Sequence, residues 1–320
     1  MNIKKIGLTA LAASLVSVSA QAGEMSVAGG ASMAIKNNSG VDAGKAITMG
    51  NQLTFTGGGE LDNGLNVSLS FVLDHADNVA SGFDSHSIVI SSDSLGAITI
   101  AGDGAGNAQS ALDTTAAGDI WDNAFKSVVA GVETPYAGLV GSDATNNKTI
   151  NYTLPTLMDG VSVAVSYGAS GAAVESSTAF GVTYTGVEGL SVSYGEGEAA
   201  STDAAKQADL TSMSLSYAIG SFTAAISETE SDMTGTGTDE ELSSFKVSYT
   251  VSDNLSVSYG EETHETAGET VDEEFSQVSA SYTTGGMTLS AAVQEAEGLG
   301  NNSGAAGKAD RWKLGVSFAF

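Results

Sequence analysis

The sequence predicts an all-β protein, specifically a transmembrane antiparallel β-barrel of sixteen strands. Three observations lead to this prediction. Apolar and small polar residues alternate with a period of two from end to end, which is typical of strands with one buried or lipid-facing side. The connections between these segments are alternately short and long, as in outer-membrane barrels. The chain also begins with an export signal.

The export signal occupies residues 1–22. Lys4 and Lys5 give a positive start, Ile6 begins a short apolar run, and Ala20-Gln21-Ala22 fits a signal-peptidase site. We expect cleavage after Ala22, which leaves residues 23–320 as a single barrel domain. The apolar run is short for a membrane-spanning helix, so an uncleaved anchor is the weaker reading.

Composition excludes several classes of function. The chain has 11 Lys and Arg against 38 Asp and Glu. Because Lys4 and Lys5 lie in the signal, the mature chain would retain 9 basic residues and a net charge of −29. A nucleic-acid partner needs a basic surface and is therefore not expected. Cysteine is absent, so disulfides and thiolate chemistry are excluded.

The strands follow from the alternation. In the last one, Trp312, Leu314 and Val316 alternate with Lys313 and Gly315. The predicted strands span 24–36, 47–57, 65–74, 84–91, 96–102, 147–154, 160–168, 178–185, 189–195, 209–219, 221–228, 242–251, 254–261, 274–284, 286–294 and 309–320. The second, fourth and later even strands are followed by short turns, and the odd strands by longer, often acidic loops. A water-soluble sandwich would not show this strict rhythm.

Tyrosines mark the strand ends. They share the apolar parity and fall near one end or the other of their strands, where an amphipathic ring meets both acyl chains and headgroups. The predicted belts consist of Tyr167, Tyr194 and Tyr259 at the loop ends, and Tyr184, Tyr217, Tyr249 and Tyr282 at the turn ends.

Closure and size predict an aqueous channel. An open sheet edge in lipid would leave backbone groups unpaired, so the last strand must pair with the first. Sixteen strands enclose a lumen too wide for side chains to fill. Its inward positions carry Ser, Thr and Gly rather than the larger apolar groups of a ligand cavity.

The connection at 103–146 is by far the longest. Trp121, Phe125, Val128 and Val129 recur at helical spacing after a possible N-cap at Asp119, which predicts a short helix. Either this connection stands outside as a surface loop, or it folds into the lumen. We favour the second reading because its apolar residues would find partners only against the inner wall.

Three stretches resemble the alpha-proteobacterial general porins, the group that includes the Rhodobacter porin: "GAITIAGDGAG", "TPYAGLVG" and the C-terminal "RWKLGVSFAF". The resemblance covers the whole mature chain. It implies a homotrimer in the outer membrane of a Gram-negative bacterium, in contact with the lipid bilayer and lipopolysaccharide. It further implies that the third loop forms the constriction and that Phe318 and Phe320 help the assembly machinery recognise the chain. The resemblance also implies an arginine cluster opposite the loop, and here the chain departs from the pattern, because Arg311 is its single arginine.

The charges of the pore follow by parity. The acidic side of the constriction is predicted to contain Asp103, Asp113, Asp119, Asp122 and Glu133. The basic residues with inward parity are Lys36, Lys246, Arg311 and Lys313. Lys36, Arg311 and Lys313 would be neighbours because the first and last strands pair. Lys36 and Arg311 could instead lie at the outer rim and bind headgroup phosphates; sequence alone leaves both readings open.

No catalytic set or cofactor site is predicted. "GDGAG" lacks the third glycine of a dinucleotide loop, and no G-x-S-x-G occurs. The three histidines are scattered without metal-ligand spacing, so no metal site is expected. The acidic runs "SETESD", "DEE" and "DEEF" lack EF-hand spacing and are interpreted as solvated loops, with weak Ca²⁺ binding as the alternative.

The sequence therefore predicts a channel, not an enzyme, through which small hydrophilic solutes diffuse passively with a preference for cations. Two alternatives remain: a substrate-selective outer-membrane channel, and a surface-binding barrel that uses its acidic loops.

Overall fold

A computed structural model describes most of the chain. The described residues are 24–39, 44–74, 85–103, 107–109, 112, 115–118, 120, 125–129, 132–135, 149–169, 176–199 and 207–320. The predicted export signal lies outside them. In the described part, no helix is long and apolar enough to cross a membrane.

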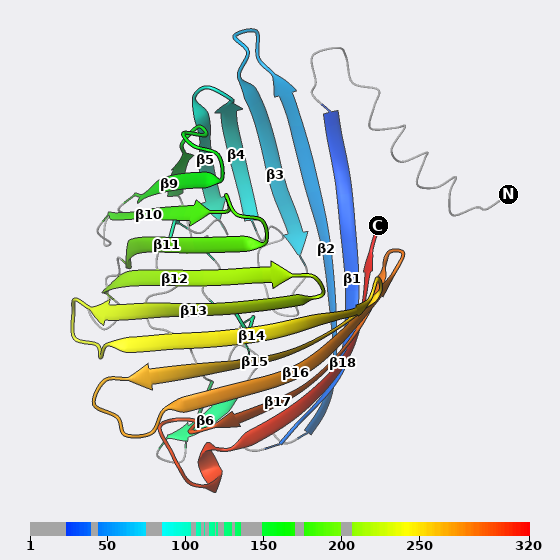
Figure 1. The fold of residues 1–320 in the computed structure, drawn as a ribbon, viewed down its shortest axis with the longest axis vertical. Coiled ribbons are helices and arrows are strands. Elements are labelled where there is room, and N and C mark those ends of the chain that lie inside the picture. Colours follow the sequence, from blue (N-terminus) through cyan, green and yellow to red (C-terminus); the bar gives the residue numbers. More distant parts are fainter. Residues whose placement is uncertain are drawn as a thin grey trace, which may run out of the picture.

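Sixteen antiparallel strands form one closed barrel, as predicted. Each strand pairs with its neighbour in the chain, and β1 closes the sheet by pairing with β18, so the wall has no free edge (Figure 1). The barrel strands are β1 (Glu24–Asn38), β2 (Gly44–Glu60), β3 (Asn66–Asp74), β4 (Ser85–Ser92), β5 (Gly96–Asp103), β8 (Thr149–Thr153), β9 (Val161–Gly168), β10 (Ser177–Tyr184), β11 (Leu190–Ala199), β12 (Ala208–Ile219), β13 (Phe222–Met233), β14 (Glu240–Ser252), β15 (Leu255–Thr266), β16 (Glu273–Thr284), β17 (Met287–Glu297) and β18 (Ala309–Ala319).

The register separates two faces of the wall. Tyr194 pairs with Met213, whereas the adjacent Ser193 pairs with Ser214, and this alternation continues around the barrel. The large apolar side chains, all seven belt tyrosines among them, are exposed on one face, which we call outward. Small hydroxyl side chains such as Ser227 occupy the other face, which we call inward. Apolar side chains are compatible with acyl chains and hydroxyls with water, so the outward face fits the lipid and the inward face fits an aqueous lumen.

Short turns and long connections lie at opposite ends of the barrel, as predicted. The turn end includes tight connections such as 220–221 and 285–286, whereas the loop end includes 75–84 and 298–308. The strands predicted over 84–91 and 274–284 are both present, as β4 and β16. In β4 the register shifts between His86 and Ser87, which interrupts its alternation.

Several strands extend further toward the loop end than predicted. β11 continues to Ala199 and β15 to Thr266, beyond the predicted ends at 195 and 261. The interpretation of the acidic runs as loops is therefore wrong, because most of their residues belong to β13, β14 and β16. Alternation simply continues there with carboxylates on outward positions. We call these residues the acidic collar: Glu196, Glu198, Asp209, Glu228, Glu230, Asp232, Glu241, Glu261, Glu265, Glu274, Glu295, Glu297 and Asp310.

The prediction of a helix in the longest connection is wrong for the residues of that connection that the structure describes. Lys126–Val129 forms β6 and pairs with β7 (Val132–Pro135) as a small hairpin outside the barrel sheet. Val128, Val129 and Val132 are β-branched, and such residues fit the pleated backbone of a hairpin better than a helix. Asp119 and Trp121 lie outside the described residues.

Candidate functional site

The inward face of the barrel binds the segment that connects β5 and β8. Backbone amides of this segment donate to serine hydroxyls of the wall: Ala108 N to Ser166 Oγ at 2.9 Å and Ala116 N to Ser227 Oγ at 2.7 Å. Two further bonds extend the row, from Ala117 N to Ser244 Oγ (3.1 Å) and from Gln109 Nε2 to Ser212 Oγ (2.7 Å). The four serines lie on β9, β12, β13 and β14, so the segment follows the inner wall across several strands.

Two inward glycines allow this close approach. A Cβ atom at Gly181 would collide with the carbonyl oxygen of Ala108. A Cβ atom at Gly195 would lie 2.7 Å from the Leu112 side chain, closer than real carbon atoms pack. The glycines of β10 and β11 therefore clear space on the wall for the segment, in a role that only a residue without a side chain can fill.

Apolar packing fixes the far part of the segment. Ile120 and Phe125 are buried against Phe275 of β16 and Leu299 of the 298–308 connection. The Phe125 and Phe275 ring centroids lie 5.8 Å apart. Phe275 is an apolar residue with inward parity, and its side chain is only 1% exposed because the segment covers it.

A buried polar cluster lies beside this apolar contact. The Nδ1 atom of His264 on β15 is 2.9 Å from Glu273 Oε2, and its Nε2 atom is 3.6 Å from Glu240 Oε2. The second oxygen of Glu273 accepts a 2.6 Å hydrogen bond from the Gly300 amide. The cluster thus connects the ends of β14, β15 and β16 to the 298–308 connection, which also packs on the inserted segment.

Most of the predicted acidic residues cannot be placed. Asp113, Asp119 and Asp122 lie outside the described residues. Asp103 ends β5 and Glu133 lies in β7, and only the backbone of these two is described. Their role in a constriction stays a prediction.

Three of the four predicted basic residues are brought together. Lys36 is directly opposite Lys313 in the β1–β18 pair, and Asn38 is opposite Arg311 two residues away. Arg311 is 5% exposed, so its guanidinium is largely covered. Lys246 has inward parity too, but it lies on β14, separate from the others. Their role as a positive wall of the pore stays a prediction.

Hydroxyl side chains dominate the rest of the inner wall. They hydrogen-bond to one another across strands, as do Ser258 and Ser279 at 2.7 Å and Thr183 and Ser193 at 3.0 Å. Such hydroxyls satisfy each other and still offer lone pairs to water, so the wall is hydrophilic without being strongly charged. Within the described ranges, no three His, Asp or Glu side chains are grouped so as to hold a metal ion.

The sequence model of the Gram-negative porin family matches residues 7–320. The chain belongs to the Gram-negative porin family. This porin therefore resides in the outer membrane of a Gram-negative bacterium. The resemblance noted from the sequence is confirmed at the level of the family, whereas the alpha-proteobacterial subgroup stays an expectation.

Solved porin structures have the same fold. OmpF of Salmonella typhi, in a complex with daunomycin, aligns with a TM-score of 0.71 and 13% identity over 95% of this chain and 99% of that chain. The anion-selective porin from Comamonas acidovorans aligns with a TM-score of 0.68 and 14% identity over 93% of this chain and 99% of that chain. A mutant Rhodobacter blastica porin aligns with a TM-score of 0.63 and 16% identity over 93% of this chain and 100% of that chain. No curated protein sequence matches significantly.

Sequence reasoning missed the residues that hold the segment in this porin. Ser166, Ser212, Ser227 and Ser244 look like any other inward hydroxyl in the alternation. A signal was nevertheless present. Leu210, Leu242 and Phe275 are apolar at inward positions near the loop end and are buried, a pattern that indicates a cover on the inner wall.

Proposed function

We propose that this porin is a passive diffusion channel for small hydrophilic solutes and that the 103–146 connection forms its constriction. The observation that carries the proposal is the row of hydrogen bonds between the connection and the inward serines of β9, β12, β13 and β14. A segment bound along the inner wall reduces the open cross-section and sets the size limit for solutes. No energy source or conformational cycle is required.

We further propose a preference for cations. The expected net charge of the mature chain is strongly negative, and carboxylates crowd the loop end. Glu230 faces Glu241 across strands and Glu241 faces Glu265 on the outward side of the wall, so their summed field surrounds the loop end of the barrel and raises the cation concentration near the channel entrance. The basic pair Lys36 and Lys313 opposes this trend within the wall. A porin named as anion-selective has the same fold, so charge, not architecture, decides the sign.

A homotrimer is proposed as the working assembly. Related structures include one described as a trimer, OmpT of Vibrio cholerae. On this chain, the outward face of β1 and β2 carries the most exposed large apolar side chains of the barrel, Met49 at 72% and Ile47 at 69%. Burial of such a surface between subunits would remove much apolar area from contact with lipid while packing it densely. We assign this face to the subunit contact.

Neither an enzymatic role nor adhesion is favoured. The described residues offer a hydroxyl-lined wall rather than a nucleophile beside a base, and solute diffusion needs no more than that. A substrate-selective channel is the closest alternative, and a surface-binding barrel the next.

The mature protein is proposed to comprise residues 23–320 after removal of the signal. Phe320, whose backbone pairs with Gly29 through bonds of 2.8 and 2.9 Å, is proposed with Phe318 as the assembly signal.

Electrical recording in planar bilayers tests the selectivity. With purified porin and a tenfold KCl gradient, the reversal potential should correspond to a higher permeability for K⁺ than for Cl⁻ at neutral pH. Raising the salt concentration on both sides should weaken the preference, because exposed carboxylates are screened within about 10 Å at 0.1 M salt. A reversal potential of the opposite sign contradicts the cation preference, and complete lack of conduction favours a plugged, surface-binding barrel. Liposome swelling with sugars of increasing size measures the exclusion limit in parallel.

A further inference from the structure

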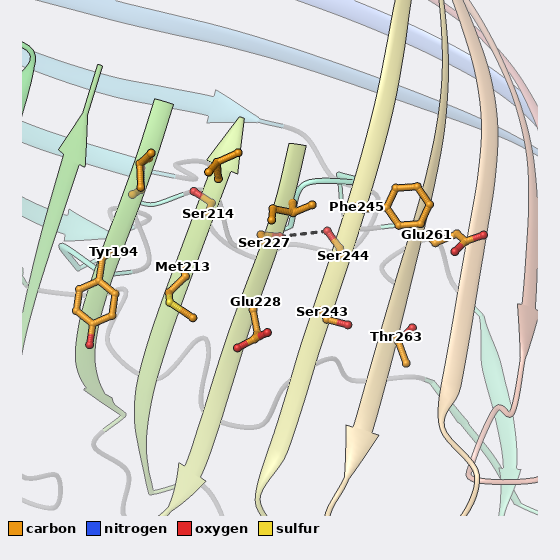
Figure 2. A pocket seen from close by; sticks show the side chains of 14 residues that line it. Tyr194, Met213, Ser214, Ser227, Glu228, Ser243, Ser244, Phe245, Glu261 and Thr263 are labelled. Atoms are coloured by element: carbon orange, nitrogen blue, oxygen red, sulfur yellow. Dashed lines mark hydrogen bonds between the residues drawn. The ribbon is translucent and has the colours of Figure 1, made fainter. Parts of the chain in front are cut away.

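The outward face of β11 to β15 contains a groove of about 570 Å³. Figure 2 shows Tyr194, Met213 and Glu228 along this face, whereas Ser227 and Ser244, joined by a 3.1 Å hydrogen bond, lie behind them on the inward parity. Ser243 lines the groove and pairs with Glu228 on one side and with Thr263 on the other. Its size is within the range of ordinary ligand sites.

Apolar and acidic groups divide the lining of the groove. Leu215, Ile226 and Phe245 form one continuous outward row across three strands. Glu228 and Glu261 belong to the same lining and to the acidic collar. The Tyr259 hydroxyl, at the belt, donates a hydrogen bond to Glu261. The groove therefore crosses the boundary at which acyl chains give way to headgroups.

The described strands around the groove carry no outward basic side chain. The strands β11 to β17 contain two basic side chains, Lys246 and His264, and both have inward parity. An anionic phosphate in the groove would meet two carboxylates, and no outward basic side chain of these strands would offset the repulsion. An ammonium group would meet two opposite charges and, beside them, aromatic faces. The rings of Phe245 and Tyr259 lie 5.9 Å apart at this point.

We propose that this groove binds a lipid with a cationic amine headgroup. Its acyl chain lies over Leu215 and Ile226, and its ammonium group lies between Glu228 and Glu261 near Phe245. Charge complementarity selects the headgroup, and the apolar row binds the chain. The wall then recognises one class of lipid on its outward face, separately from conduction through the lumen.

Spin-labelled lipids test this directly. The porin is reconstituted in phosphatidylcholine with nitroxide-labelled lipids of identical chains that carry an ammonium, a choline or a phosphate headgroup. Electron paramagnetic resonance gives the motionally restricted fraction of each. The ammonium lipid should associate about fivefold more strongly than the choline lipid, the preference that exposed ion pairs worth up to ~1 kcal/mol can provide. The phosphate lipid should associate least.

Paired variants locate the site. Glu228→Gln with Glu261→Gln should reduce the ammonium preference to near unity, whereas Glu274→Gln with Glu295→Gln, in the same collar outside the groove, should leave most of it. Ser243→Trp should fill the groove and lower association of the ammonium lipid. Val293→Trp, on an outward position of β17 that is 56% exposed, serves as its control. Normal conductance of each variant confirms a folded barrel.

Three results would overturn the proposal. The first is equal association of ammonium and phosphate lipids, or a preference untouched by Glu228→Gln with Glu261→Gln. The second is strong phosphate association that EDTA abolishes, because divalent cations would then bridge the collar to lipid. The third is loss of the trimer in Ser243→Trp, measured by light scattering, which would make the groove a subunit contact.

Discussion

Single residues decide how closely the inserted segment approaches the wall. Gly181 and Gly195 face inward where Ala108 and Leu112 pass, and neither position has room for a Cβ atom. Glycine in a strand usually weakens it, so its presence here is best explained by the close approach of a second backbone. In a barrel whose inner wall faced only water, the same two glycines would weaken their strands without any gain.

Gly181→Val should displace the segment from the wall. The added side chain overlaps the Ala108 carbonyl, and overpacking of this kind costs about 1–3 kcal/mol, which the segment avoids by moving. We expect a higher single-channel conductance with unchanged strand content by circular dichroism. Ala46→Val places the same side chain at an exposed inward position of β2 and should leave the conductance unaltered. Equal conductance of both variants would contradict the role of Gly181.

At the scale of elements, the strands are extended and their serines form a binding row. β11 and β15 continue past the tyrosine level, and there the inward Gly197 lies close to Gln109 and the inward Gly260 lies close to Ala117 of the segment. Each hydrogen bond in this row contributes only about 1 kcal/mol. The row therefore holds the segment because it contains several such bonds. The His264 cluster and the Phe125–Phe275 contact fix the same segment at its far end.

Removal of the hydroxyl row should loosen the segment without unfolding the barrel. A quadruple variant with Ser166, Ser212, Ser227 and Ser244 changed to Ala loses the four hydrogen bonds to the segment, about 4 kcal/mol if they add. It also loses the cross-strand bonds Ser212–Thr229 and Ser227–Ser244. Limited proteolysis should then cut between residues 104 and 148 much faster than in the parent. The matched control changes Ser191, Ser216, Ser256 and Ser281, inward serines nearer the turn end. Resistance equal to that of the control would show that the row does not hold the segment.

The barrel itself could be predicted from sequence because its signals are local. Alternation along each strand and the rhythm of the connections specified sixteen strands, and closure followed from the cost of an open edge in lipid. Two features depended on contacts distant in sequence and were mispredicted. Phe125 and Val128 suggested a helix, whereas packing on Phe275 and pairing of Val128 with Glu133 gave an extended hairpin. Much of the collar was assigned to loops because carboxylates rarely indicate strands.

For the whole molecule, the central claim is that a closed barrel conducts through a lumen narrowed by the segment between β5 and β8. The wall, its hydroxyl lining and the bound segment together define the channel. The strands provide the wall, the inward serines and glycines bind the segment, and the remaining cross-section passes solutes. The acidic collar lies on the other face of the same strands, where it meets the headgroup region.

Single-channel conductance of a variant that lacks residues 107–143 tests this claim most directly. Removing the bound segment should raise the conductance about twofold or more, because conductance grows with the open cross-section. It should also raise the size limit in liposome swelling. A variant that lacks residues 201–206, in another connection at the loop end, should conduct as the parent does. If both deletions leave conductance and size limit unchanged in folded barrels, the segment does not constrict the channel.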